Sequence, residues 1–154
     1  LAADEDAVAM LPQPFVTVAQ TQNENIRVAL DMTEEWQKAA EANGEEATLI
    51  TGVVIARNDF IAEHPEAVEL FLEQYAASVD YVTSNVSDAA QLVGNYDIVA
   101  APVAEKAIPY CNITCITGNE MKQKLSSYLT VLAEQNPAAV GGALPEDDFY
   151  YNAD

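Results

Sequence analysis

The stretch TLITGVVIAR, residues 48–57, carries the strongest strand signal in the chain. Short apolar runs that are rich in β-branched residues and flanked by polar ones are typical of buried strands. Gly52 lies inside this run, and a glycine at such a place suggests a bend or a close approach of another backbone. We therefore expect residues 49–56 to form a strand.

Two other apolar runs predict strands on the N-terminal side of this stretch. Residues 7–11 (AVAML) stop at Pro12-Gln13-Pro14, which is typical of a buried strand that ends in a rigid turn. Residues 26–30 (IRVAL) form the second run. The sequence thus predicts at least three strands.

Helical patterns alternate with these runs and fill the C-terminal half. They predict helices at residues 15–20, 33–43, 65–85, 87–93, 102–108 and 118–135. Asp31 or Thr33 can cap the helix that carries Trp36, and Pro65 suits the first position of the longest helix. Apolar stripes should bury Phe71, Leu72 and Tyr75 on that helix, and Leu125, Leu129 and Leu132 on the last one.

Strands that alternate with helices indicate an α/β fold. We expect a mixed or parallel sheet flanked by helices, with a helix-rich C-terminal half. The chain, residues 1–154, is taken as a single α/β region. Residues 1–25 would supply a strand and a turn, and residues 26–154 would supply the remaining strands and the C-terminal helices.

The charge of the chain excludes some classes of partner. With 25 acidic and 6 basic residues the formal net charge is −19, so phosphate backbones would be repelled and nucleic-acid binding is excluded. The same charge disfavours docking on anionic lipid. It suits a secreted protein that must stay in solution.

The residues that could carry catalysis or hold a metal do not form a known pattern. Cys111 and Cys115 lie about 13 Å apart in an extended segment, whereas a disulfide needs α-carbons closer than about 7 Å. We predict that they are not bonded to each other. His64, the single histidine, precedes Pro65 at a helix start, and Asp147-Asp148 is interpreted as a solvated acidic turn. No catalytic residue, metal or cofactor is predicted.

The turn after residues 7–11 is the first candidate for ligand binding. Ligands of open α/β sheets bind beyond the carboxyl ends of strands. In Pro12-Gln13-Pro14-Phe15, Gln13 offers an amide donor and acceptor and Phe15 offers a stacking face. A purely structural turn is the equal alternative. Gly52 is the second candidate, because a missing side chain lets a backbone approach a ligand.

Three segments together resemble one protein family. They are DAVAMLPQP at residues 6–14; GVVIAR at 52–57 with Phe60, His64-Pro65-Glu66 and the long helix that follows; and GGALP at 141–145 with Phe149-Tyr150-Tyr151. In this order they resemble the extracytoplasmic solute-binding proteins of ABC importers, of the sulfonate, taurine and thiamine-precursor type. The resemblance runs through nearly all of the chain.

This resemblance implies a type II periplasmic-binding-protein-like sandwich of two lobes that hold a small solute in the cleft between them. It implies delivery of the solute to an ABC permease, and a bacterial protein in the periplasm or anchored at the cell surface as a lipoprotein. It does not imply an enzyme. Thiamine-pyrimidine synthases of eukaryotes resemble this fold and use an active-site histidine, but His64 does not take that role. An enzyme or a sensory module on the same fold is the alternative.

The resemblance also bears on how much of the protein the chain represents. Leu1-Ala2-Ala3 leads within a few residues into the apolar run at 7–11, and two lobes need more residues than 154. We therefore expect the C-terminal portion of a longer solute-binding protein, in which residues 1–25 are a strand and turn of the second lobe or hinge. Such a portion exposes apolar strand edges, so we expect it to self-associate through residues 7–11 and 49–56, by edge pairing or by exchange of an element.

Overall fold

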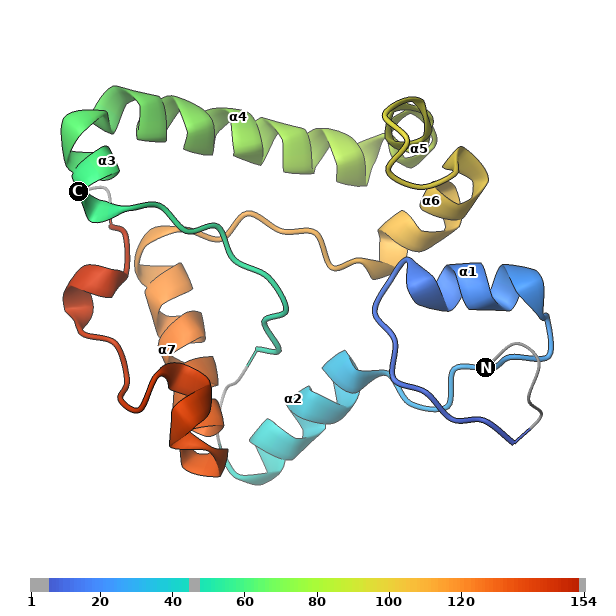
Figure 1. Cartoon of the computed structure of the whole chain (residues 1–154), viewed down its shortest axis with the longest axis horizontal. Helices are drawn as coiled ribbons and strands as arrows, with labels where there is room; N and C mark the ends of the chain where they lie inside the picture. The colour runs from blue at the N-terminus through green and yellow to red at the C-terminus, as the bar shows by residue number, and fades with distance from the viewer. Residues whose placement is uncertain (1–5, 45–47, 153–154) are drawn as a thin grey trace. The chain divides into compact units, whose positions relative to one another are not determined.

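The computed structural model describes residues 6–44 and 48–152 (Figure 1). The chain divides into two compact units, the first formed by Leu1–Val28 and Arg57–Cys115, the second by Ala29–Ala56 and Ile116–Asp154. The first unit contains α1 (Phe15–Gln22), α3 (Asn58–Glu63), α4 (Pro65–Ser84), α5 (Val86–Asn95), α6 (Ala101–Ala107) and the 3₁₀ turn η1 (Ile108–Tyr110). The second contains α2 (Met32–Ala42), α7 (Gly118–Gln135) and the 3₁₀ turns η2 (Pro137–Val140) and η3 (Asp147–Phe149).

The core of the first unit is made mostly of small side chains where α5 packs against α6, with Ile108 of η1 buried beside them. Ala89 and Ala104 are each 2% exposed and Ala90 is fully buried. Gly94 has no side chain at the contact, and a Cβ placed there would lie 2.9 Å from the Cβ of Ala101. Half-buried aliphatic side chains surround this centre: Val82, Val86, Val93, Val99 and Ile113. The small residues bring the two helices close together, and the neighbouring helices pack around that contact.

In the second unit, α2 and the C-terminal tail each contact α7. Asp31 caps α2, and the Trp36 and Tyr128 rings lie 5.3 Å apart between centroids at 51°. The tail returns to α7, where Lys122 Nζ lies 2.8 Å from a carboxylate oxygen of Asp147. Tyr150 is 8% exposed beside this ion pair. Burial raises the pKa of the Tyr150 hydroxyl, while the Lys122 charge opposes that rise and Asp147 adds to it.

The predicted α/β fold is wrong, because no strand forms among residues 6–44 and 48–152. Residues 7–11, 26–30 and 49–56, the three predicted strands, are irregular segments. Many of their large side chains stay exposed: Val8 is 96% exposed, Leu30 65% and Ile55 81%, while Ile26, Leu49 and Ile50 are half-buried. A strand needs a partner for its backbone groups, and no described segment pairs with these three, so their apolar pattern alone does not make a sheet.

The predicted helices are confirmed. Helices can be predicted from local sequence because a helix closes its hydrogen bonds within its own segment. Helices are present at each of the six predicted places, with Asp31 as a cap and Pro65 at the first turn of α4. The short helix α3 and the 3₁₀ turns η2 and η3 were not predicted. Leu1-Ala2-Ala3, on which the expectation of a longer protein rests, lies outside the described residues.

The predicted apolar stripes are only partly buried. On α4, Val68 and Val79 are buried, Leu72 and Tyr75 are half-buried, and Phe71 remains 44% exposed. On α7, the leucines at 125, 129 and 132 are all half-buried. The expectation that Phe71 is buried is therefore wrong, and its truncation should cost less than the removal of a core side chain.

The contact between α5 and α6 gives a direct test of the first unit. In Gly94→Ala the new methyl group meets Ala101, so the helices must move apart, and we expect a loss of about 1–3 kcal/mol in the free energy of unfolding. That loss would outweigh the gain in helix propensity, which is about 1 kcal/mol. Urea unfolding followed by circular dichroism measures the change.

Gly52→Ala is the matched control, because no atom lies within 4 Å of the added methyl group. It should change stability by no more than about 0.5 kcal/mol. Equal effects of the two substitutions would show that the close approach at Gly94 does not exist.

Candidate ligand-binding turn

The turn at residues 12–15 is built onto the first turn of α1. The Gln13–Pro14 peptide bond is cis. The carbonyl oxygen of Pro12 accepts a hydrogen bond from the Val16 N–H at 3.3 Å, and that of Pro14 accepts one from the Val18 N–H at 3.0 Å. The turn and the helix therefore form one hydrogen-bonded piece, and α1 packs on α6.

The side chain of Gln13 is held by Thr17, one helical turn further on. The Thr17 hydroxyl donates to Oε1 of Gln13 at 2.8 Å, and the Thr17 N–H donates to the same oxygen at 3.4 Å. Thr17 is buried, so this contact satisfies a hydroxyl that has left water. Nε2 of Gln13 makes no hydrogen bond to any other described residue and remains a donor.

An aromatic face lies two residues after this amide. Phe15 begins α1 and its side chain is 61% exposed. Pro12 is exposed and Pro14 is half-buried. The turn thus presents a fixed amide donor and an open phenyl ring, a combination that suits a small solute with an oxygen acceptor and an apolar part.

Gly52, the other predicted ligand contact, belongs to the second unit, whereas residues 12–15 belong to the first. It is exposed, and the space beside its α-carbon is open. No described residue makes the close backbone approach that was expected there. A contact of Gly52 with a ligand stays a prediction.

In the described part of the chain, the histidine and the two cysteines make no hydrogen bond or ring contact with residues 12–15. His64 is exposed at the start of α4, and its ring lies 4.9 Å from the Phe60 ring. Cys111 and Cys115 are both free thiols, as predicted. Cys111 Sγ donates to the Ala107 carbonyl at 3.2 Å, and burial raises its pKa. Within the described residues, no group of three or more His, Cys, Asp or Glu side chains could hold a metal ion.

Sequence reasoning missed three features of these units. Thr17 was not recognised as the partner of Gln13, although their spacing of four is that of neighbours on a helix. Trp36 Nε1 is buried with no hydrogen-bond partner in the described part of the chain. A hollow of about 280 Å³ lies where the C-terminal tail meets α7, lined by Leu129, Val140, Ala143, Pro145 and Phe149. Its only signal was the apolar character of the tail.

No protein-family model, curated protein or solved structure matches this chain. Across the described residues, no helix has the length and apolar character needed to cross a membrane.

The contact between Gln13 and Thr17 can be tested by substitution. In Gln13→Ala the buried Thr17 hydroxyl loses its acceptor, and we expect a loss of about 1–3 kcal/mol in the free energy of unfolding. Gln37→Ala is the matched control, since Gln37 donates only to Glu41 on the exposed surface of α2. It should stay within about 0.5 kcal/mol of the unchanged chain. A Gln13 variant as stable as the Gln37 variant would contradict the contact.

Proposed function

We propose that the chain is a substrate-binding component of an ABC importer, which captures a small solute and delivers it to a membrane permease. Support comes from the order of the three motifs, DAVAMLPQP, GVVIAR with the helix beginning at Pro65, and GGALP with its aromatic tail. The α/β sandwich that this resemblance implied is not part of the proposal.

The observation that carries the proposal is the state of the Gln13 amide. Its oxygen is occupied by Thr17, so the side chain is held in one orientation, and its Nε2 donor is left without a partner among the described residues. A donor that is already oriented loses little conformational freedom when a ligand binds. The exposed Phe15 ring adds apolar contact area close to that donor in the chain.

A passive binding role agrees with the other side chains. A nucleophile needs a base within hydrogen-bond reach, and Cys111 donates its thiol hydrogen to a backbone carbonyl. His64 contacts Phe60. Within this proposal the acidic surface keeps an extracytoplasmic protein in solution until it meets the permease.

Ligand binding is tested by thermal unfolding with three probes: taurine, a short alkanesulfonate and the pyrimidine precursor of thiamine. We expect at least one of them to raise the melting temperature of the chain, because a ligand that binds only the folded state stabilises it. Phe15→Ala should abolish that increase. Phe60→Ala, which removes an exposed aromatic ring from α3, should leave it unchanged.

Mass spectrometry of the purified chain separates the binding role from the alternative of an enzyme. A bound solute should be released unchanged when the chain is denatured. The absence of any temperature increase with all three probes would contradict the proposal, and chemical conversion of a probe would favour the enzyme.

A further inference from the structure

The segment between α1 and α2, residues 26–32 (IRVALDM), has an unusual symmetry of chemistry about its centre. Ala29 stands in the middle, Val28 and Leu30 are aliphatic, Arg27 and Asp31 carry opposite charges, and Ile26 and Met32 close the two ends. Read from either end, the segment gives the same order of side-chain types except that the charge changes sign. An antiparallel pair of such segments would place opposite charges against each other at both ends.

Within this segment, the central residues 27–30 are free to make such a contact, whereas the backbone of Ile26 and the carbonyl of Asp31 are already hydrogen-bonded. Val28 is 58% exposed and Leu30 is 65% exposed. The backbone N–H and C=O groups of residues 27–30 make no hydrogen bond to other described residues. An exposed row of unpaired backbone groups with apolar side chains is a template for pairing with another chain.

Arg27 is one of the few cations of the chain, and it has no carboxylate partner among the described residues. Arg57 pairs with Asp59, and three of the lysines also have acidic partners, Lys38 with Glu34 and Glu35, Lys122 with Asp147 and Lys124 with Glu120. Arg27 is exposed, and in a chain of net charge −19 an unpaired arginine is a place where a carboxylate can bind.

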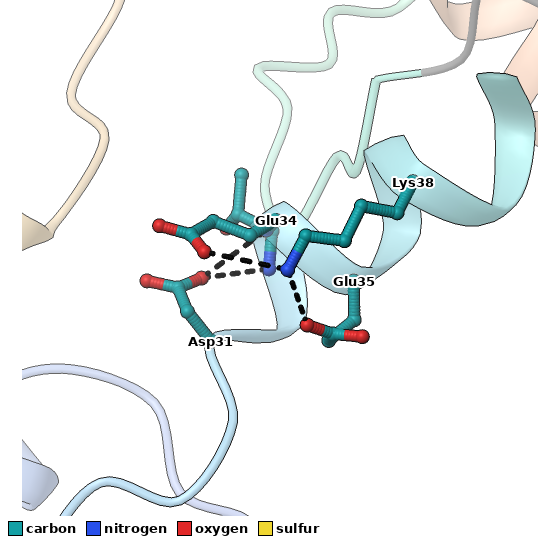
Figure 2. A network of polar contacts seen from close by, with 5 residues as sticks. Asp31, Glu34, Glu35 and Lys38 are labelled. Atoms are coloured by element: carbon teal, nitrogen blue, oxygen red, sulfur yellow. Dashed lines mark hydrogen bonds and ion pairs between the residues drawn. The ribbon is translucent and has the colours of Figure 1, made fainter.

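The carboxylate of Asp31 is oriented and half of it is unused. Figure 2 shows the Asp31 side chain at the start of α2, where one oxygen, Oδ1, accepts from the Thr33 N–H at 2.8 Å and from the Glu34 N–H at 3.4 Å. Oδ2 has no hydrogen bond to another described residue. The cap therefore fixes the carboxylate and leaves Oδ2 to accept from an arginine.

The negative charges that follow Asp31 are partly neutralised. Lys38 Nζ lies 2.7 Å from Glu35 Oε1 and 3.7 Å from Glu34 Oε2. Dashed lines in Figure 2 mark these two contacts. The hydrogen bond to Glu35 raises the pKa of Lys38, so its charge is retained. Repulsion between the first turns of two α2 helices is thereby reduced.

We propose that residues 26–32 are an interface through which two copies of this chain pair antiparallel about a two-fold axis at Ala29. In this register Arg27 of each copy lies opposite Asp31 of the other, and Val28 lies opposite Leu30. The Arg27, Ala29 and Asp31 side chains then share one face and the aliphatic side chains share the other. The occupant is a second copy because the chain itself supplies the complementary charges in the complementary order.

The pairing does not depend on the proposed solute-binding role. We expect its affinity to be low. A contact of about seven residues from each copy falls at the low end of interface sizes. Sedimentation equilibrium of the chain at physiological salt should therefore show a monomer–dimer equilibrium that moves toward dimer with concentration. A monomer at all concentrations would overturn the proposal.

Charge substitutions locate the interface. Arg27→Glu places two pairs of like charges in contact. We expect the dissociation constant of the dimer to rise about tenfold or more. Lys106→Glu is the matched control, because it makes the same charge change at an exposed lysine with no partner among the described residues. Equal weakening by both substitutions would overturn the assignment, since it would show only general repulsion. Circular dichroism checks that both variants keep their helices.

A cysteine scan tests the register, in a chain with Cys111→Ser and Cys115→Ser. Ala29→Cys should form a disulfide-linked dimer under mild oxidation, since directly opposite residues have α-carbons about 4.5–5.5 Å apart. Glu24→Cys, also exposed and outside the segment, should stay monomeric under the same conditions. Cross-linking at position 24 without cross-linking at position 29 would overturn the pairing.

Discussion

The close contact between α5 and α6 is the constraint on which the first unit depends. Three alanines and a glycine supply it, and no larger side chain of the described residues is as deeply buried. Such a core gains little apolar burial per residue, because alanine has a single methyl group to remove from water. The unit therefore relies on close backbone approach and on half-buried valines around the contact. Several large side chains of the unit are left exposed, among them Phe15, Leu70 and Phe71.

The helices could be predicted from the sequence, whereas the three predicted strands do not form among the described residues. Asp31 and Pro65 mark helix starts through local chemistry, and the hydrogen bonds that follow lie within a few residues of each. A strand depends on a partner that lies elsewhere in the chain or in another chain. Residues 49–56 have the composition of a strand, yet nothing described pairs with them, and Val53 and Val54 remain exposed. The apolar pattern indicated a tendency of these side chains to be buried, but it did not identify a partner strand.

The candidate site shows the same division. The turn at Pro12 and the helix after it followed from the two prolines, and Gln13 and Phe15 were recognised as the polar and aromatic groups of that turn. The role of Thr17 was missed because a threonine in a helix has many alternatives, and only the structure shows its hydroxyl bonded to Gln13. The hollow beside α7 was missed because it depends on the path of the C-terminal tail.

The described residues form helices, and the first unit has a core of small side chains. Among these residues, the segments with strand-like sequences are unpaired. Amide hydrogen exchange followed by mass spectrometry, at low protein concentration, tests this description most directly. It predicts slow exchange for the amides of α5 and α6 and exchange near that of an unstructured peptide for residues 49–56. Protection of residues 49–56 equal to that of α5 would contradict it, because those amides would then be hydrogen-bonded as in a sheet.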